Sequence, residues 1–328
     1  YNPKDSTKNL RIMYAAENRG YENIEHDANI AAAPGDDRTS FMNKSFRVCR
    51  VFGIDIRIHI LLPLFLIAMI IIWMPMISQD PSNIGWYLLL ILLFNVSLWE
   101  TVLIHELGHC FAGYLVGGHT DRVLLWPLGG LAFTQPPATM NNAAGDSQRR
   151  KNQIIISVGG PLTHIPHMIL YAVLLLWYCG ESTPFAPTTC PYNSLGGSNP
   201  FNAWIFWQQV IITNCDGNGS LCFWYDFLML SFMINFWLFL INLFVPAFPL
   251  DGSKIFVNCL MNKYNVDKTA TIYCWVTGAI AALCIVVGAV WFRSNTILFF
   301  IGVWAAFQVY QMVMFLRAGD ARNHPLFT

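Results

Sequence analysis

Long apolar runs separated by short polar segments are the dominant pattern of this sequence. A run of about 18 or more predominantly apolar residues is long enough to cross a bilayer as a helix. Six such runs cover residues 58–77, 84 to about 116, 154–178, 227–248, 272–292 and 297–316. The second is too long for one straight crossing, so we expect it to tilt or to protrude. The pattern predicts an all-α, polytopic membrane protein with about six transmembrane helices.

Glycine and proline residues interrupt the third run. Gly159, Gly160 and Pro161 follow one another, and Pro166 comes shortly afterwards. Proline lacks the backbone N–H that a helix interior requires, so we expect the third helix to be kinked or broken here. Between the second and third runs, the Pro-Leu-Gly-Gly sequence at 127–130 separates two short apolar stretches. This arrangement predicts a small membrane-associated β hairpin between helices 2 and 3.

The composition agrees with a membrane location. Hydrophobic residues make up 55% of the 328 residues and charged residues 12%, whereas soluble domains carry about 25% charged residues. These values exclude a soluble globular enzyme and a disordered chain. The net charge is zero, with 19 basic and 19 acidic residues. No global field therefore attracts a polyanion, and we expect no nucleic acid among the partners.

The distribution of the charges predicts the orientation. If the N-terminus lies in the cytosol, every Lys and Arg except Arg293 falls on the cytosolic side, as the positive-inside rule requires. We therefore expect both termini to be cytosolic. Residues 1–45 form a polar tail that is expected to be disordered. Residues 46–318 form the transmembrane domain, and 319–328 form a short C-terminal tail.

The outer loop of this topology, residues 179–226, contains no Lys or Arg. It holds Cys179, Cys190, Cys215 and Cys222, together with the N-glycosylation acceptor at 218–220. An oxidising lumen would favour disulfides among these cysteines; the alternative is four free thiols. These features favour the eukaryotic secretory pathway as the host membrane, with a plastid or bacterial membrane as the alternatives.

The second apolar run contains the sequence His-Glu-Leu-Gly-His at 105–109. Residues four apart lie on one face of a helix, so the imidazoles of His105 and His109 can bind one metal ion. Glu106 can reach a water on that ion. Two imidazoles and one carboxylate are typical zinc ligands, with the fourth position left open. The alternative is a pair of interior histidines hydrogen-bonded to neighbouring helices.

Asp251 is the best candidate for the third ligand. It follows Pro246 and Pro249 at the end of the fourth apolar run. In the predicted topology, the second and fourth helices run in the same direction. Asp251 and the two histidines therefore reach the same depth near the cytosolic face. The alternative role for Asp251 is an interfacial carboxylate in a turn. Glu100 is a rival ligand, but it lies about 140° away from the face of His105.

The HELGH sequence and the PAFPLDG sequence at 246–252 resemble the site-2 protease family of intramembrane zinc metalloproteases (peptidase M50-like). Three weaker matches support the resemblance, which covers roughly residues 48–316. Residues 51–54 resemble the segment that enters the first helix of the family. Residues 127–130 resemble its membrane-associated β segment, and 159–162 resemble the stretch that opens its third core helix.

The resemblance implies a function and a set of site residues. His105, His109 and Asp251 would bind one Zn2+ per chain, and Glu106 would be the catalytic acid and base. The activity would be hydrolysis of peptide bonds in or near the transmembrane segments of membrane-protein substrates, as in regulated intramembrane proteolysis. Its partners would be those substrates and the lipid bilayer. The alternatives are a multi-span metal-ion transporter and a non-catalytic protease-like membrane protein.

The chain departs from the family pattern at two positions. His164 stands where the family has an asparagine, and Asn242 lies four residues before Pro246 where the family has three. Either His164 or Asn242 is a candidate donor to the oxyanion or support for the site. The alternative for His164 is a packed, hydrogen-bonded interior histidine.

The segment at 117–136 is a candidate for substrate binding. Leu124, Pro127, Gly129 and Gly130 belong to the predicted hairpin. An edge strand there would hold an extended substrate through main-chain hydrogen bonds. The alternative is an amphipathic surface loop.

Overall fold

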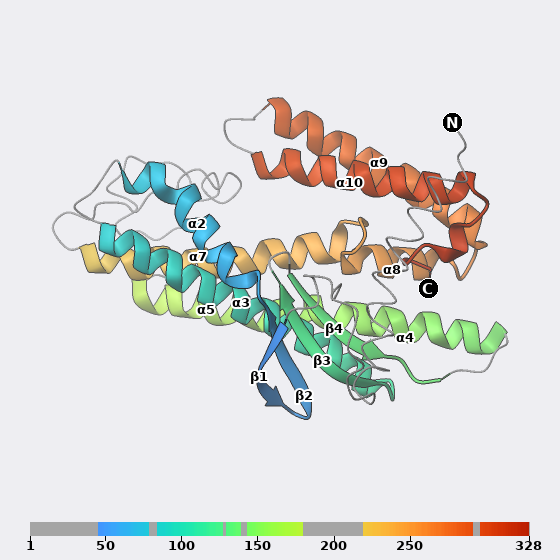
Figure 1. The fold of residues 1–328 in the computed structure, drawn as a ribbon, viewed down its shortest axis with the longest axis horizontal. Coiled ribbons are helices and arrows are strands. Elements are labelled where there is room, and N and C mark those ends of the chain that lie inside the picture. The colour runs from blue at the N-terminus through green and yellow to red at the C-terminus, as the bar shows by residue number, and fades with distance from the viewer. Residues whose placement is uncertain are drawn as a thin grey trace, which may run out of the picture.

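The computed structural model describes residues 45–78, 84–126, 129–138, 143–179, 219–290 and 296–327. In this part of the chain, five segments are long and apolar enough to cross a membrane, and one shorter apolar helix precedes them. A four-stranded sheet completes the fold (Figure 1). The predicted fold class, a polytopic helical membrane protein with a small β element, is therefore confirmed.

The helices follow the predicted runs closely. They are α2 (Leu62–Ile77), α3 (Ile84–Leu115), α4 (Ala143–Leu162), α5 (His164–Cys179), α7 (Gly219–Phe244), α8 (Asp251–Leu260), α9 (Val266–Val290) and α10 (Thr296–Arg317). The third run is divided into α4 and α5 at Thr163, where the glycine and proline residues predicted a break.

Several predicted helix starts are too late, since α4, α7 and α9 begin before residues 154, 227 and 272. Two further boundaries, in the first and fourth runs, are also wrong. The first apolar run was expected to become helical at 58, but Ile58 and His59 belong to a strand and the helix begins at Leu62. The fourth run was expected to continue to 248, but α7 ends at Phe244. Pro246 cannot donate a helical hydrogen bond and disfavours helical geometry in the residue before it. Asp251 therefore begins a new helix and does not end the fourth one.

The sheet contains the predicted hairpin and a second one. The strands β1 (Ser45–Val51), β2 (Ile54–His59), β3 (His119–Trp126) and β4 (Gly129–Gln135) lie in that order. The β1–β2 and β3–β4 pairs are antiparallel, and β2 pairs with β3 in parallel. The first hairpin was not predicted; its turn places Phe52 and Gly53 at positive φ values of 51° and 85°.

The sheet lies against the part of α3 that carries the HExxH sequence. Ile56 of β2 and Val123 and Leu125 of β3 are buried in one cluster with Val102 and Cys110 of α3. This packing fixes the sheet beside the histidines.

Figure 1 shows two groups of helices. The first group contains α2, α3, α5 and α7 with the sheet at one end, and α4 continues from it. The second group is the antiparallel pair α9 and α10, and α8 lies between the two groups. The C-terminal residues join the second group, because Ala321 and Leu326 are buried in a cluster with Val257 of α8 and Tyr273 of α9.

Some predictions concern parts of the chain that the structure does not describe. These are the N-terminal tail up to residue 44, the glycosylation acceptor, Pro127 and the disulfides proposed for the outer loop. Cys179 and Cys222 lie at helix ends, but their side chains are outside the described ones, as are Cys190 and Cys215.

Candidate metal centre

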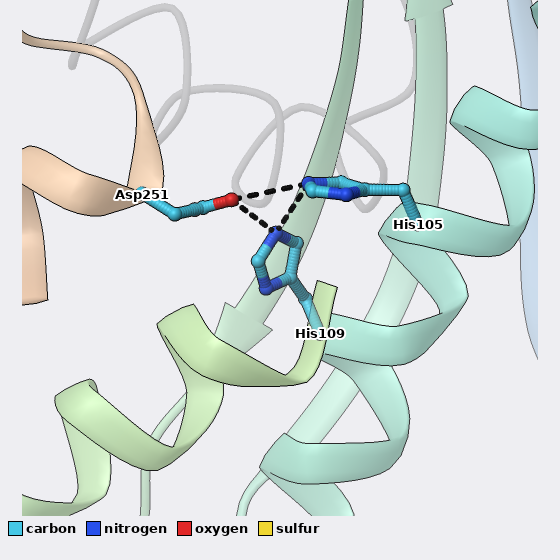
Figure 2. Close-up of side chains that lie close together, drawn as sticks. All are labelled: His105, His109 and Asp251. Carbon is cyan, nitrogen blue, oxygen red and sulfur yellow. Dashed lines mark hydrogen bonds and ion pairs between the residues drawn. The ribbon is translucent and has the colours of Figure 1, made fainter. Parts of the chain in front are cut away.

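Three side chains from two distant parts of the sequence converge in the interior (Figure 2). His105 and His109 lie on successive turns of α3, and Asp251 is the first residue of α8. Their relative exposures are 6%, 8% and 5%. Together they form a group of side chains with ligand atoms close enough to hold a metal ion.

The three ligand atoms form a nearly equilateral triangle. His105 Nε2 lies 3.1 Å from Asp251 Oδ2 and 3.1 Å from His109 Nε2. His109 Nε2 lies 3.2 Å from Asp251 Oδ2. Ligands of a tetrahedral zinc ion with bonds of about 2.0–2.1 Å are about 3.3 Å apart. The separations therefore suit a zinc ion with a fourth position open.

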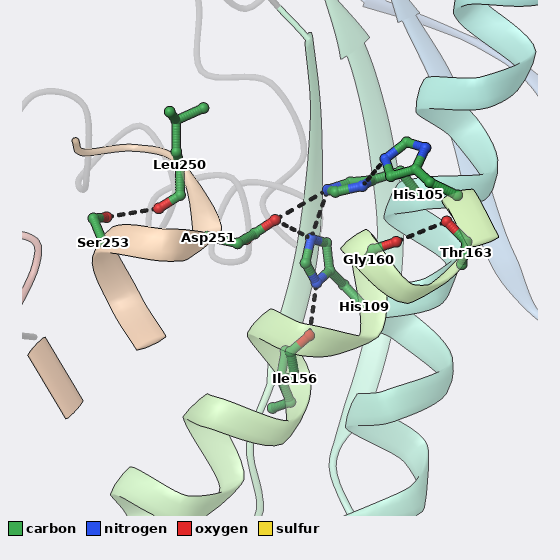
Figure 3. Close-up of polar contacts among 9 residues, drawn as sticks. His105, His109, Ile156, Gly160, Thr163, Leu250, Asp251 and Ser253 are labelled. Atoms are coloured by element: carbon green, nitrogen blue, oxygen red, sulfur yellow. Dashed lines mark hydrogen bonds and ion pairs between the residues drawn. The ribbon is translucent and has the colours of Figure 1, made fainter. Parts of the chain in front are cut away.

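The orientation of His109 favours metal binding. Its Nδ1 lies 2.7 Å from the carbonyl oxygen of Ile156 (Figure 3). A carbonyl oxygen only accepts, so Nδ1 carries the proton and the Nε2 of the neutral ring presents a lone pair to the triangle. A hydrogen bond of this kind, on the ring nitrogen remote from the metal, is typical of histidine ligands.

The two helices that frame the site are in backbone contact. A Cβ atom at Gly159 of α4 would lie 2.6 Å from the carbonyl oxygen of Gly108 and 2.5 Å from the Cβ of Ala112. The small residues Gly108 and Ala112, one turn apart on α3, thus pack directly against Gly159 of α4. This close approach brings both histidines to the end of α4.

Glycines also allow backbone to approach the site directly. A Cβ atom at Gly160 would lie 2.4 Å from His109 Nε2 and 2.7 Å from His105 Nε2. The carbonyl oxygen of Gly160 accepts a 2.7 Å hydrogen bond from Thr163 Oγ1, which closes the break between α4 and α5. No larger residue fits at position 160 without displacing a ligand nitrogen.

Asp251 is positioned by tight packing where α7 and α8 meet. A Cβ atom at Gly252 would lie 2.8 Å from the carbonyl oxygens of both Leu243 and Val245. The Asp-Gly pair therefore combines a ligand with the small residue that lets α8 start against the end of α7. Ser253 Oγ donates a 2.6 Å hydrogen bond to the Leu250 carbonyl, so this buried hydroxyl has its partner within the first turn of α8 (Figure 3).

The segment before Asp251 is held by α9. Thr277 Oγ1 donates a 2.7 Å hydrogen bond to the carbonyl oxygen of Pro246. The backbone N–H of Phe248 donates to the hydroxyl of Tyr273 at 3.1 Å. These two contacts fix the non-helical segment between α7 and α8, and hence the position of Asp251.

Glu106 is buried beside the triangle without belonging to it. Its relative exposure is 7%. A Cβ atom at Gly130 of β4 would lie 2.3 Å from Glu106 Cγ and 2.6 Å from Oε1. The carboxylate therefore lies directly against the backbone of β4.

The structure places the other candidate residues in different surroundings. Glu100 lies apart from the triangle, with its Oε1 3.2 Å from His167 Nε2. His164 is fully buried, and its Nε2 lies 3.0 Å from His105 Nδ1. Asn242 is partly buried in α7. Asn235 was not predicted as a site residue, and its Oδ1 lies 3.1 Å from His164 Nδ1.

The candidate substrate segment is divided between two strands. Leu124 lies in β3, where it is paired with Arg57 of β2 and Leu131 of β4. Its main chain therefore lies inside the sheet. Gly129 and Gly130 belong to β4, which is an edge strand of the described sheet.

Comparison with known proteins gives a consistent result. The sequence model of Peptidase family M50 matches residues 93–285. A zinc metalloprotease from Methanocaldococcus jannaschii is 26% identical over 266 residues, which is 81% of this chain and 60% of that relative. The chain thus spans about three fifths of the length of this curated relative. The solved structure of a site-2 protease from the same organism aligns over 82% of this chain and 95% of its own, with 23% identity and a TM-score of 0.43.

Proposed function

The chain belongs to peptidase family M50, and on this premise we propose that it is an intramembrane zinc metalloprotease. Its reaction is the hydrolysis of peptide bonds in or near the transmembrane segments of membrane-protein substrates. The observation that carries this proposal is the convergence of three ligand atoms within 3.1–3.2 Å. Two of them belong to histidines of the apolar helix α3, in which the residue after His105 is a buried glutamate.

The metal would be held by His105, His109 and Asp251. When bound, zinc acts as a Lewis acid that makes water a nucleophile near neutral pH and polarises a substrate carbonyl. The three ligands are buried and tightly packed, so their geometry needs little reorganisation before the reaction.

Glu106 is the proposed general base and acid. It accepts a proton from the attacking water and delivers it to the nitrogen of the leaving amide. Its position next to the triangle allows both steps from one carboxylate. The absence of a side chain at Gly130 lets this carboxylate lie directly against the backbone of β4.

His164 and Asn242 are not equally available to donate a hydrogen bond to a substrate oxyanion. Both ring nitrogens of His164 already contact side chains, one of His105 and one of Asn235. His164 therefore serves the zinc ligand, and Asn242 is the candidate donor to the substrate carbonyl.

The edge of β4 is the proposed binding site for an unwound substrate. A helical substrate hides its peptide bonds in its own hydrogen bonds, so it must become extended before cleavage. An extended chain that pairs with β4 is added to the sheet by main-chain hydrogen bonds. Because Gly130 lies against Glu106, a strand paired there passes close to the carboxylate.

The chain is a multi-pass membrane protein, and we propose that both its termini face the cytosol. The support is the charge asymmetry, since Arg293 is the sole basic residue assigned to the outer side. The metal site then lies toward the cytosolic face, from which water would enter. The eukaryotic secretory pathway is the proposed location, on the strength of the outer-loop cysteines and glycan acceptor.

The test is a paired assay on purified protein in liposomes that contain a transmembrane substrate. Glu106→Gln preserves the ligands, so it should retain zinc and lose about 10²–10⁴-fold in cleavage rate. His105→Ala removes a ligand and should lose both zinc and cleavage. Cleavage by Glu106→Gln at a nearly wild-type rate would refute the mechanism. Zinc flux into the vesicles that survives Glu106→Gln would favour the transporter.

A further inference from the structure

A stripe of buried polar residues runs along α3 toward the metal site. Ser97, Thr101, His105 and His109 are spaced four apart on this apolar helix, and each is at most 8% exposed. Polar groups inside a membrane span are costly unless they find partners there. The stripe therefore requires a complementary set of polar groups on a neighbouring helix.

The complementary groups lie on α7. Ser97 Oγ donates to Ser231 Oγ at 3.0 Å, and Asn235 Nδ2 donates to Thr101 Oγ1 at 3.2 Å. Ser231 and Asn235 are 1% and 0% exposed. The α3 and α7 helices are thus connected by a buried polar seam that ends at the amide of Asn235.

The seam fixes which way the Asn235 amide points. Asn235 Nδ2 lies 3.0 Å from the carbonyl oxygen of Ser231, which can only accept a hydrogen bond. The amide nitrogen must therefore be on this side. Its oxygen, Oδ1, faces His164 Nδ1 at 3.1 Å and accepts from it.

The direction of hydrogen bonding continues through His164 to the zinc ligand. Because Nδ1 of His164 donates to Asn235, the Nε2 of the neutral ring is an acceptor. The atom 3.0 Å away from it is His105 Nδ1, which must then be the donor. A neutral His105 with its proton on Nδ1 presents the lone pair of Nε2 to the triangle.

We propose that His164 and Asn235 are positioning residues that hold His105 in the metal-binding tautomer. The chain of hydrogen bonds runs from His105 through His164 to Asn235, and the amide is held by Ser231 and Thr101. This inference rests on the proposed function, since it assigns the relay to a zinc ligand.

The two histidine ligands differ in how they are oriented. His109 donates to a main-chain carbonyl, that of Ile156, which a side-chain substitution at 156 leaves in place. His105 depends on two side chains contributed by α5 and α7. Substitution of the relay should therefore affect one ligand and leave the other correctly oriented.

The test measures the zinc affinity of the purified protein by competition with a chelator. His164→Leu and Asn235→Leu remove the relay and should each weaken zinc binding by about 10–100-fold, the usual cost of losing such a partner. His164→Gln should restore binding to near the wild-type value. A glutamine amide can accept from His105 through its oxygen and donate to Asn235 through its nitrogen.

The matched control is Asn95→Leu. Asn95 is a buried asparagine of α3 that donates to the Ile91 carbonyl and lies outside the relay. The zinc affinity of the Asn95→Leu protein should equal that of the wild-type protein. The double variant of His164 and Asn235 should bind zinc no more weakly than the weaker single variant, because both substitutions interrupt one chain.

Two results would overturn the relay. One is wild-type zinc affinity in folded His164→Leu and Asn235→Leu proteins. The other is a loss in the double variant equal to the product of the two single losses, which indicates independent packing defects. Failure of the wild-type protein to bind zinc would instead overturn the proposed function, so the two failures are distinguishable.

Discussion

Two histidine–carboxylate clusters share the helix α3 but have different geometry. At the metal site, two imidazole nitrogens and one carboxylate oxygen meet at 3.1–3.2 Å, and the side chains are at most 10% exposed. One and a half turns earlier on α3, Glu100 meets a single imidazole, that of His167 on α5, at 3.2 Å. The Glu100 side chain is 43% exposed.

The two clusters differ in the number of atoms whose lone pairs point at one another and need a shared proton or cation. His167 Nδ1 donates to the Thr163 carbonyl at 3.1 Å, so its Nε2 faces Glu100. One shared proton between Nε2 and the carboxylate satisfies this pair. At the metal site, one proton can bridge only two of the three atoms. A divalent cation satisfies all three atoms at once. Histidine and carboxylate side chains therefore form an ion pair at Glu100 and His167 and a metal site at His105, His109 and Asp251.

The largest expected difference between the two clusters is the change in zinc affinity when the carboxylate of each is replaced by an amide. Asp251→Asn keeps the size of the side chain but removes the charge of a proposed ligand. Zinc affinity should fall by more than about 100-fold, beyond the loss typical of a partner outside the ligand set. Glu100→Gln is the matched control, and its zinc affinity should stay within about twofold of wild type. Chelator competition on both proteins measures this, and equal losses would contradict the distinction.

Backbone crowding at the metal site predicts the next largest effect. Gly160→Ala would place a methyl group 2.4 Å from His109 Nε2 and 2.7 Å from His105 Nε2. The rings are held by hydrogen bonds on their other nitrogens, so they cannot easily withdraw. We expect cleavage to fall by about 100-fold, as for a catalytic group displaced by about 1 Å.

Gly278→Ala is the control for this substitution. Gly278 lies in α9, and a Cβ atom there meets nothing within 4 Å. Alanine should preserve cleavage and stabilise the helix by roughly 0.5–1 kcal/mol. A Gly160→Ala enzyme as active as Gly278→Ala would show that the ligands tolerate the added methyl group.

Much of the fold follows from local pattern, and the exceptions have physical causes. The apolar runs predict the spans, and Pro161 and Pro166 predict the division between α4 and α5. The β1–β2 hairpin was missed although Ile54, Ile56 and Ile58 alternate with polar residues, a period-two signal for a strand. The long apolar run that follows obscured this alternation, and the first helix was therefore expected to begin too early.

Only those site residues whose positions follow from the local sequence or the topology could be predicted. The HExxH spacing fixes two side chains on one helix face, and the shared depth of Asp251 follows from topology. Asn235 depends on the packing of α7 against α3, which no local pattern specifies. One signal was available, since the polar residues of α3 from Ser97 to His109 recur every four positions.

A buried histidine outside the spans provides a reference with no metal role. His324 is 1% exposed and lies edge-on to the rings of Phe248 and Phe315. Burial lowers the pKa of His324 from 6.5 to about 4. Its contribution to stability is thus fully present above pH 6.5 and is lost as the pH falls toward 4, because the unfolded chain binds the proton first.

The expected loss from His324 is about 2 kcal/mol between pH 7 and pH 5. His324→Gln should remove this part of the pH dependence when unfolding of metal-free protein is followed in mixed micelles. The use of metal-free protein separates this effect from proton competition at the zinc ligands. An unchanged pH profile in His324→Gln would show that the ring gains a partner for its charged form.

The smallest effect is expected for the Glu100–His167 pair itself. A double-mutant cycle of Glu100→Gln and His167→Leu isolates its coupling energy from the packing of either side chain. Polar contacts between membrane helices contribute about 0.6 kcal/mol on average and at most about 1.7 kcal/mol. The exposed carboxylate places this pair near the average, because solvent or lipid headgroups can replace His167 as its partner. Unfolding in mixed micelles should therefore give a coupling near 0.6 kcal/mol, with zinc content unchanged in all three variants. A coupling of several kcal/mol, or a loss of zinc, would mean that the two clusters act as one polar unit and that the distinction drawn from their lone pairs is wrong.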